Sequence, residues 1–255
     1  MLTGIFRFFI FWYICGIILL TFDLLPPWLE WANSVFLITG GVIAGIYFSQ
    51  LYGIVKALIY SFIIVSLSIY IEHLGVETGF LFGNYYYNEN FGLKIADTPV
   101  TIGFAWLLII GCSHEISRGI SLTLTGWKQV AVFIPTASLA AVTMDLILDP
   151  VAYHVQEYWI WEDTGMYYDI PFSNFAGWFI LAFFFHCLPF IFKQDLSAAR
   201  SIWQNRMALM FGAVILMFSI LSISGGVYGA AILVILLTMI WYVLYYWRLQ
   251  HDSSR

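Results

Sequence analysis

Long apolar stretches recur along the chain and alternate with short polar segments. Eight of them approach the roughly 20 residues that an α-helix needs to cross the hydrocarbon core of a bilayer. They lie at residues 5–22, 33–50, 54–71, 99–115, 127–148, 174–192, 207–222 and 227–247. A membrane β-barrel would instead show segments of about 10 residues with alternating polarity. The pattern predicts an all-α fold, a polytopic membrane helical bundle of about eight transmembrane helices that forms a single transmembrane domain over residues 1–255.

The composition agrees with lipid as the main solvent. Hydrophobic residues make up 62% of the 255 residues and charged residues make up 10%, and the mean hydropathy is +0.87. A water-soluble domain could not keep that much apolar surface away from water. We therefore expect the lipid bilayer as the surroundings and no nucleic-acid partner. The first stretch has bulky aromatic residues and no small-residue cleavage site, so we expect a retained helix and not a signal peptide.

Basic residues indicate the orientation, because positively charged loops resist translocation. With eight crossings, nine basic residues fall on one side of the membrane and Lys94 alone falls on the other. The nine are Arg7, Lys56, Arg118, Lys128, Lys193, Arg200, Arg206, Arg248 and Arg255. We therefore expect a multi-pass protein of the cell membrane with both termini cytosolic. The two long connections, 73–98 and 149–173, would then lie outside, and a site built from them would face the extracytoplasmic leaflet.

The first candidate site is the segment Asp145-Leu-Ile-Leu-Asp149-Pro150. Two acids that are four residues apart share one face of a helix, about one turn from each other. Burial and mutual repulsion should keep one of them protonated, and an uncharged carboxylic acid can donate a proton. An ionisable residue within a membrane helix is a functional hypothesis by default. The alternative for Asp149 is a cap on a turn before Pro150 at the interface, whereas Asp145 lies deeper in apolar sequence.

The second candidate site runs from Glu72 to Tyr87. Glu72 belongs to an apolar stretch, and Glu77, Tyr85 and Tyr87 follow in a segment rich in glycine and tyrosine that we expect to be a loop. On the predicted topology, both glutamates emerge on the same side of the membrane as Asp145. Glu77 could equally be a solvated charge, while Glu72 has the better prospect of burial. The tyrosines could equally belong to an aromatic belt at the bilayer interface.

The third candidate site is aromatic and carries almost no positive charge. Its residues are Trp159, Trp161, Tyr167, Asn174 and Trp178. Such a surface suits an apolar or cationic guest. Asn174 and Trp178 share a helix face, where the amide could position a water molecule and the indole could meet a cation. Each tryptophan taken singly could also be part of an aromatic belt.

No metal ion or cofactor is expected. His114 and His186 face away from the outer acids on this topology, no HxxxH or HxxHH pattern occurs, and His186 is expected to be a packing residue. Cys15, Cys112 and Cys187 lie in apolar stretches without CxxC spacing, which indicates neither a disulfide framework nor a zinc site.

Three segments carry motifs that together suggest a family. Residues 77–87 contain Glu-x-Gly and Gly-x-Tyr-x-Tyr, residues 145–150 end in Leu-Asp-Pro, and residues 159–178 contain Trp-x-Trp, Tyr-Tyr and Pro-x-x-Asn-Phe-x-Gly-Trp. With these motifs the chain resembles the carotenoid 1,2-hydratases of the CruF type, which include the bisanhydrobacterioruberin hydratases. Asp169 departs from the family pattern, in which a glycine usually occupies this place, and the departure bears on the turn before Pro171.

The resemblance implies an enzyme that adds water across the terminal isopropylidene double bond of an acyclic, lycopene-like carotenoid and gives a tertiary alcohol. This chemistry needs a poorly solvated acid, surroundings that tolerate a tertiary carbocation, and one held water molecule. Asp145 or Glu72 could supply the proton. The tryptophans could stabilise the cation through their π faces, while Asn174 and an ionised partner such as Asp149 orient the water.

Other functions are open to consideration. A membrane prenyltransferase also uses aspartates spaced as Asp145 and Asp149 are, but magnesium diphosphate needs more carboxylates and more basic partners than Lys94 alone. A transporter or pigment-binding protein would place polar residues near the midplane in paired repeats, whereas the candidates here cluster at one membrane face. A retinal-binding protein would need a lysine inside a late helix, and Lys193 only borders those helices.

Overall fold

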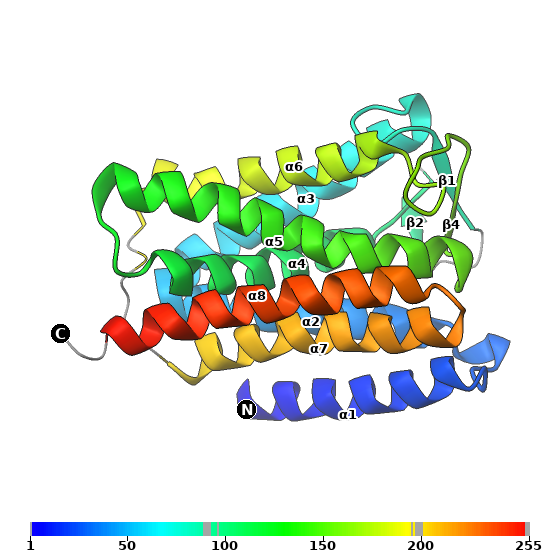
Figure 1. Ribbon diagram of the computed structural model, residues 1–255, viewed down its shortest axis with the longest axis horizontal. Helices are drawn as coiled ribbons and strands as arrows, with labels where there is room; N and C mark the ends of the chain where they lie inside the picture. The colour runs from blue at the N-terminus through cyan, green and yellow to red at the C-terminus, as the bar shows by residue number, and fades with distance from the viewer. Residues whose placement is uncertain (1, 89–92, 96, 195, 197–200, 253–255) are drawn as a thin grey trace.

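The computed structural model describes residues 2–88, 93–95, 97–194, 196 and 201–252. Within these residues, eight α-helices run side by side in a bundle (Figure 1). They are α1 (Leu2–Thr21), α2 (Trp31–Tyr52), α3 (Ile54–Thr78), α4 (Thr101–Ser121), α5 (Gly126–His154), α6 (Phe172–Ile191), α7 (Ile202–Ser224) and α8 (Tyr228–Asp252), and a 3-10 turn, η1 (Pro27–Leu29), joins α1 to α2. Each helix coincides with one apolar stretch, so the predicted helical membrane bundle is confirmed. Arg200 and Arg255, which entered the charge count, lie outside the described residues.

Several helices extend further than the apolar pattern predicted, and two of these extensions bear on the candidate site. α3 continues beyond residue 71 to Thr78, and α5 continues beyond residue 148 to His154. Asp149 and Pro150 therefore lie inside α5, and the alternative that Asp149 caps a turn is wrong. The two extensions carry polar side chains to the same end of the bundle.

Short strands join the two longest connections at that end (Figure 1). β1 (Tyr85–Tyr87) pairs antiparallel with β4 (Trp159–Trp161), so that Tyr85 lies opposite Trp161 and Tyr87 lies opposite Trp159. β2 (Lys94–Ile95) and β3 (Thr98–Pro99) form a second antiparallel pair. Segments that the sequence suggested were loops are thus held by cross-strand hydrogen bonds, which fix their aromatic side chains relative to the helices.

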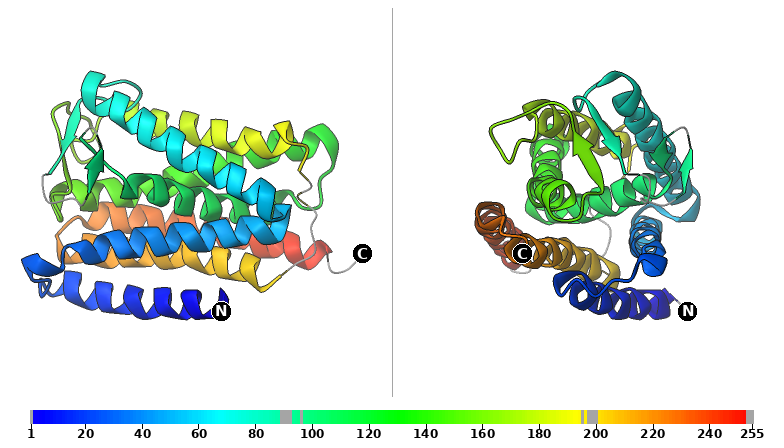
Figure 2. Two further views of the ribbon diagram at one scale, coloured as in Figure 1. Left: turned by 180° about the vertical axis from the view of Figure 1, so that it is seen from behind. Right: turned by 90° about the vertical axis from the view of Figure 1, so that its right-hand side faces the viewer.

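The central helix is α4, which contacts α2, α3, α5, α7 and α8. Figure 2 shows α3 and α6 on one side of it and α1 and α7 on the other. Among the described residues, seven helices are long and apolar enough to cross a membrane, and α4 is not one of them. It carries His114, Glu115 and Arg118, and nearly all of its side chains are buried. Neighbouring helices surround these polar groups in place of lipid, as membrane proteins require.

Small residues let α4 approach its neighbours closely. A Cβ atom at Gly41 of α2 would lie 2.8 Å from the carbonyl oxygen of Phe104, and one at Gly103 of α4 would lie 2.9 Å from the carbonyl oxygen of Val65 in α3. Membrane helices commonly pack through such glycine contacts. The close approach of α3 and α4 brings side chains from both helices into one site.

Candidate functional site

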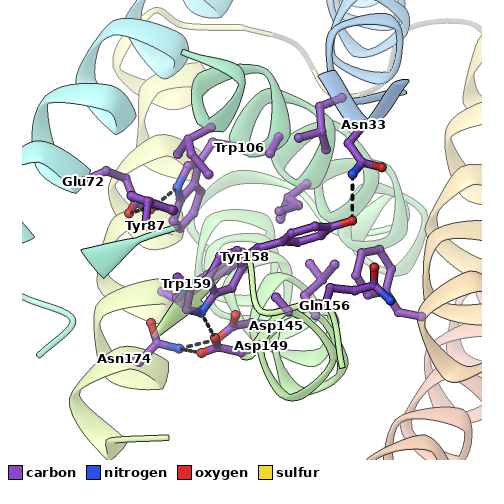
Figure 3. Close-up of a pocket in the computed structure, with 18 of the residues that line it drawn as sticks. Asn33, Glu72, Tyr87, Trp106, Asp145, Asp149, Gln156, Tyr158, Trp159 and Asn174 are labelled. Atoms are coloured by element: carbon purple, nitrogen blue, oxygen red, sulfur yellow. Dashed lines mark hydrogen bonds between the residues drawn. The ribbon is translucent and has the colours of Figure 1, made fainter. Parts of the chain in front are cut away.

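A pocket of about 980 Å³, partly open to the surroundings, lies at the end of the bundle that carries β1 and β4. Residues from α1 to α7 contribute to its wall, which is mostly apolar. Figure 3 shows a group of polar side chains that point into it, which we call the carboxylate cluster. This cluster consists of Glu72, Asp145, Asp149 and Asn174.

Asp145 and Asp149 face the pocket from the same side of α5, as their spacing predicted, and both are buried. The side chain of Asn174, near the start of α6, points its amide toward both of them (Figure 3). Its Nδ2 donates to Oδ2 of Asp145 at 2.9 Å and to Oδ2 of Asp149 at 2.5 Å. One amide group therefore uses both of its hydrogens to hold two carboxyl groups side by side.

The two aspartates differ in how many hydrogen bonds they accept. Oδ1 of Asp149 accepts from Nε1 of Trp159 at 2.6 Å and from Nε1 of Trp161 at 3.2 Å, in addition to the bond from Asn174. Among the described residues, Asp145 accepts only the bond from Asn174. Each donor stabilises the ionised form of a carboxyl group. Asp149 is therefore better suited to carry charge, and Asp145 is better suited to hold a proton.

Glu72 brings a third buried carboxyl group from α3. Its Oε2 accepts from the hydroxyls of Tyr85 at 2.5 Å and Tyr87 at 2.9 Å, and its Oε1 accepts from Nε1 of Trp106 at 2.9 Å. Burial raises the pKa of both tyrosine hydroxyls well above the usual value, and the neighbouring Glu72 carboxylate raises it further. Both hydroxyls therefore remain donors. With three donors, Glu72 resembles Asp149 and not Asp145.

Aromatic rings form much of the wall around these acids. The ring centroids of Trp106 and Trp178 are 4.4 Å apart, and those of Tyr85 and Trp161 are 4.9 Å apart. All four residues line the pocket. The electron-rich faces of such rings attract a positive charge without offering a nucleophile that would bond to it.

Nine of the predicted site residues line the pocket, and two do not. Glu77 is exposed on the last turn of α3, which fits the alternative of a solvated charge. Tyr167 donates to the carbonyl oxygen of Leu146 at 2.7 Å and packs edge-on against Phe175. Its hydroxyl thus holds the connection before α6 against α5 and does not reach the carboxylate cluster.

Sequence reasoning missed four residues of the wall whose side chains can form hydrogen bonds, namely Asn33, Trp106, Gln156 and Tyr158. Trp106 lies inside an apolar stretch, where nothing in the local pattern indicates a hydrogen bond to Glu72. Tyr158 directly precedes the Trp-x-Trp motif, and that proximity was the one available signal. Asn33 comes from the start of α2, far from every motif.

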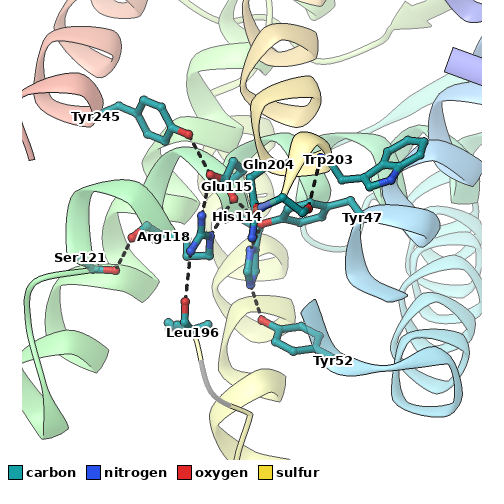
Figure 4. A network of polar contacts seen from close by, with 11 residues as sticks. Tyr47, Tyr52, His114, Glu115, Arg118, Ser121, Leu196, Trp203, Gln204 and Tyr245 are labelled. Atoms are coloured by element: carbon teal, nitrogen blue, oxygen red, sulfur yellow. Dashed lines mark hydrogen bonds and ion pairs between the residues drawn. The ribbon is translucent and has the colours of Figure 1, made fainter. Parts of the chain in front are cut away.

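A second buried polar cluster lies further along α4 (Figure 4). We call it the arginine cluster, and it consists of Tyr47, Tyr52, His114, Glu115, Arg118 and Tyr245. Arg118 donates from Nε and Nη2 to the two oxygens of Glu115 at 2.8 and 3.0 Å. The hydroxyls of Tyr47 and Tyr245 each donate to the same carboxylate at 2.8 Å. None of these side chains lines the pocket.

Among the described residues that line the pocket, the ionisable side chains include three acids and no basic group. No lysine, arginine or histidine is found among its described lining residues. Within the same described part of the chain, no group of three or more His, Cys, Asp or Glu side chains is arranged to hold a metal ion. A protonated aspartate beside a hydrogen-bonded carboxylate, in an apolar pocket with aromatic faces, can transfer a proton to an apolar guest and stabilise the cation that forms.

The chain is similar to known proteins over most of its length. Residues 32–241 match a family model described as "Carotenoid biosynthesis protein". The chain is also similar to a bisanhydrobacterioruberin hydratase of Haloarcula japonica, with 28% identity over 123 residues. That alignment covers 46% of this chain and 40% of the relative, so the chain spans less than half the length of the curated protein it matches. No solved structure matches the chain significantly.

Proposed function

Because this chain belongs to the family of carotenoid biosynthesis proteins, we propose that it is a hydratase that adds water across the terminal isopropylidene double bond of an acyclic carotenoid. The observation that carries the proposal is the pair Asp145 and Asp149, bridged by one amide in the wall of an apolar pocket. The name of the Haloarcula japonica relative supports it. The product is a tertiary alcohol.

In the proposed mechanism, Asp145 is the general acid. Asp149 and Glu72 each accept three hydrogen bonds and remain ionised, while Asp145 keeps the proton beside them. The Asp145 proton goes to the alkene carbon that bears one hydrogen, and the π electrons form the new C–H bond. The positive charge develops on the carbon that bears two methyl groups, where it is tertiary and most stable.

Water then completes the addition. An oxygen lone pair of the water bonds to the tertiary cation. The oxonium proton then passes to a carboxylate of the carboxylate cluster, which again contains one protonated acid. Trp106, Trp161 and Trp178 turn aromatic surface toward the pocket and stabilise the cation before water reaches it. The reaction involves no net oxidation or reduction and therefore needs no redox cofactor. The groups that act on the carotenoid and the water in this mechanism are all side chains of this chain.

The rest of the pocket suits the hydrocarbon chain of the substrate. Leu20, Phe36, Met217 and Phe218 form an apolar arm that leads away from the carboxylate cluster toward α1, α2 and α7. The end group would occupy the cluster while the polyene follows this arm toward lipid. The excess of basic residues at the opposite helix ends supports a pocket that faces the extracytoplasmic leaflet, with both termini cytosolic.

Expression of the chain in a host that accumulates lycopene tests the proposal. The pigment extract should contain a product heavier than lycopene by one water molecule, with its hydroxyl on the tertiary carbon of the end group. The Asp145→Asn variant, expressed to the same membrane level, is the control. Carotenoid that binds the purified protein and leaves it with unchanged mass would instead favour a pigment-binding or transport function.

Removal of metal ions tests the proposal that hydration needs no metal cofactor. We expect purified protein treated with a chelator to keep its rate of hydration, because proton addition and water capture need no Lewis acid in this scheme. Loss of turnover that returns when one metal ion is added back would contradict it, and would also revive the prenyltransferase-like alternative for Asp145 and Asp149.

A further inference from the structure

A second cavity, of about 680 Å³, adjoins the pocket beside the start of α2. Its wall includes polar side chains from three connections and two helices, in contrast to the mostly apolar pocket. These are Glu30, Ser34, Asn88, Thr101 and Glu157. We call this cavity the vestibule. Its acids, hydroxyls and amides are groups that water solvates well.

The vestibule and the pocket share one wall. Asn33, Leu37, Gln156 and Tyr158 line both cavities. Nδ2 of Asn33 donates to the hydroxyl of Tyr158 at 2.8 Å, on the side of the pocket away from Glu72 (Figure 3). The wall that the two cavities share thus includes a side-chain hydrogen bond between α2 and the connection after α5.

Tyr158 is held firmly in this wall. Its backbone N–H donates to the carbonyl oxygen of Ala152 at 2.8 Å, and its carbonyl oxygen accepts from the N–H of Asn88 at 3.0 Å. The first bond ties it to α5, one turn from Asp149, and the second ties it to the end of β1. The bond between its hydroxyl and the Asn33 amide joins two side chains, so rotation of the Asn33 side chain would break it without a change in the backbone.

We propose that the vestibule is the route by which water reaches the carboxylate cluster, with Asn33 and Tyr158 as its gate. The inference rests on the proposed function, because hydration consumes one water molecule for each alcohol formed. Lipid offers almost no water, and a bound carotenoid would fill the apolar arm. Amide and hydroxyl groups at the gate can exchange their mutual hydrogen bond for bonds to a passing water molecule.

Silver-ion accessibility tests the route without any carotenoid. All three native cysteines are replaced by alanine, and Ala152→Cys adds a thiol in the pocket wall that silver ions, close to water in size, can reach only from an aqueous path. Ser34→Phe places a ring in the vestibule. Val35→Phe is the matched control, because Val35 is the next residue of α2 and lines neither cavity.

We expect Ser34→Phe to slow the reaction of the introduced thiol with silver severalfold, and Asn33→Ala to speed it, while Val35→Phe leaves it unchanged. In protein with its native cysteines, Ser34→Phe should lower kcat for hydration by a similar factor and leave KM for the carotenoid unchanged. Tyr158→Phe keeps the ring and opens the gate, so it repeats the Asn33→Ala result if that variant folds poorly.

The Ala152→Cys protein is the parent in this experiment. If its thiol reacts with silver ions at the same rate with Ser34→Phe, with Asn33→Ala and with neither change, the proposed water route is wrong, whatever the rate of hydration. A lower kcat in Ser34→Phe that Val35→Phe shares would also count against it, since the loss would then come from bulk in α2. If silver rates change as expected but the parent protein hydrates no carotenoid, the aqueous route stands and the proposed function fails.

Discussion

The two buried polar clusters of this protein, both reached by α4, differ in how their charges are balanced. In the arginine cluster, Glu115 accepts hydrogen bonds from Nε and Nη2 of Arg118 and forms a buried ion pair with it. In the carboxylate cluster, three acids share a pocket whose described lining has no basic side chain. An ion pair satisfies its charge without a proton, whereas crowded carboxyl groups lower their energy when one of them retains a proton. The helix α4 thus borders one cluster in which an ion pair balances the charge and one whose described lining has no basic side chain.

The clusters also differ in what they connect. The arginine cluster ties α4 to α2 through Tyr47, to α8 through Tyr245, and to Leu196, whose carbonyl oxygen accepts from Nη1 of Arg118 at 3.2 Å. Every one of these groups is satisfied inside the protein. The carboxylate cluster borders open space instead. We infer that the first cluster fixes the arrangement of helices on which the second depends.

The largest expected effect on activity is that of Asp145→Asn. Asparagine keeps the volume of the side chain and the contact with Asn174 but has no acidic proton. The hydration rate should fall by roughly two to four powers of ten, the usual contribution of general acid catalysis. The measurement is kcat with carotenoid in purified membranes, together with a check that the protein still inserts and binds carotenoid.

The other acids of the carboxylate cluster supply the controls for this change. Asp149→Asn should cost less than Asp145→Asn if Asp149 only tunes its neighbour and orients water. Glu72→Gln tests the competing donor directly. Normal activity in Asp145→Asn beside an inactive Glu72→Gln would move the acid from α5 to α3.

The next effect should appear in stability and not in chemistry. Glu115→Gln leaves the guanidinium of Arg118 buried without a counter-charge, a change that costs about 3–5 kcal/mol in buried ion pairs. We expect a lower midpoint of thermal unfolding in detergent and a lower yield of folded protein. The kcat of the fraction that folds should remain near the parent value, since no atom of this cluster reaches the pocket.

Replacing both partners sharpens that result. The double variant Glu115→Leu with Arg118→Met removes both charges and keeps apolar volume, so it should recover part of the lost stability. Recovery should be incomplete because the hydroxyls of Tyr47 and Tyr245 each lose a hydrogen bond to the Glu115 carboxylate. A double variant less stable than Glu115→Gln would show that the cluster does more than balance one charge.

A smaller effect is expected from the donors that hold Asp149. Trp159→Phe keeps an aromatic ring but removes an N–H that lies 2.6 Å from Oδ1 of Asp149. The loss of one hydrogen bond to a charged group should lower kcat roughly 10- to 100-fold. Trp161→Phe should cost less, since its bond is longer at 3.2 Å.

Tyr245→Phe is the matched control in the arginine cluster, because it removes one donor to Glu115. It should lower stability slightly and leave kcat unchanged. If Tyr245→Phe slowed hydration as much as Trp159→Phe does, the distinction between the two clusters would be lost, and a connection along α4 would have to be sought.

The sequence predicted the helices and most of the carboxylate cluster because both depend on local periodicity. Apolar length marked the eight helices, and the four-residue spacing put Asp145 and Asp149 on one face of α5. Periodicity indicates which residues share one face of a helix. It does not indicate which other elements pack against that face. The bridging role of Asn174 and the bond from Trp106 to Glu72 therefore needed the three-dimensional arrangement.

The arginine cluster is a second case in which the sequence pattern did not indicate what a side chain contacts. Arg118 counted in sequence as a basic residue near a helix end, yet it is buried with Glu115 three residues before it. His114 was expected only to face away from the outer acids, and its two ring nitrogens form hydrogen bonds with the hydroxyls of Tyr47 and Tyr52. The strand pairing of β1 with β4 was also not foreseen, because three-residue strands leave too little pattern to read.

The smallest expected effects belong to the two site candidates that lie outside the pocket. Glu77→Gln changes an exposed side chain at the end of α3, five residues beyond Glu72, and should leave both kcat and KM within a factor of about two, because surface changes rarely cost more than half a kcal/mol. Tyr167→Phe removes the bond to the Leu146 carbonyl oxygen and should lower thermal stability slightly, with kcat little changed. Measuring both variants beside Glu72→Gln in one membrane preparation separates residues that share a motif from residues that share a site. A large loss of kcat in Glu77→Gln, with KM and stability unchanged, would mean that the end of α3 turns toward the substrate when carotenoid binds, and the carboxylate cluster would then have to include it.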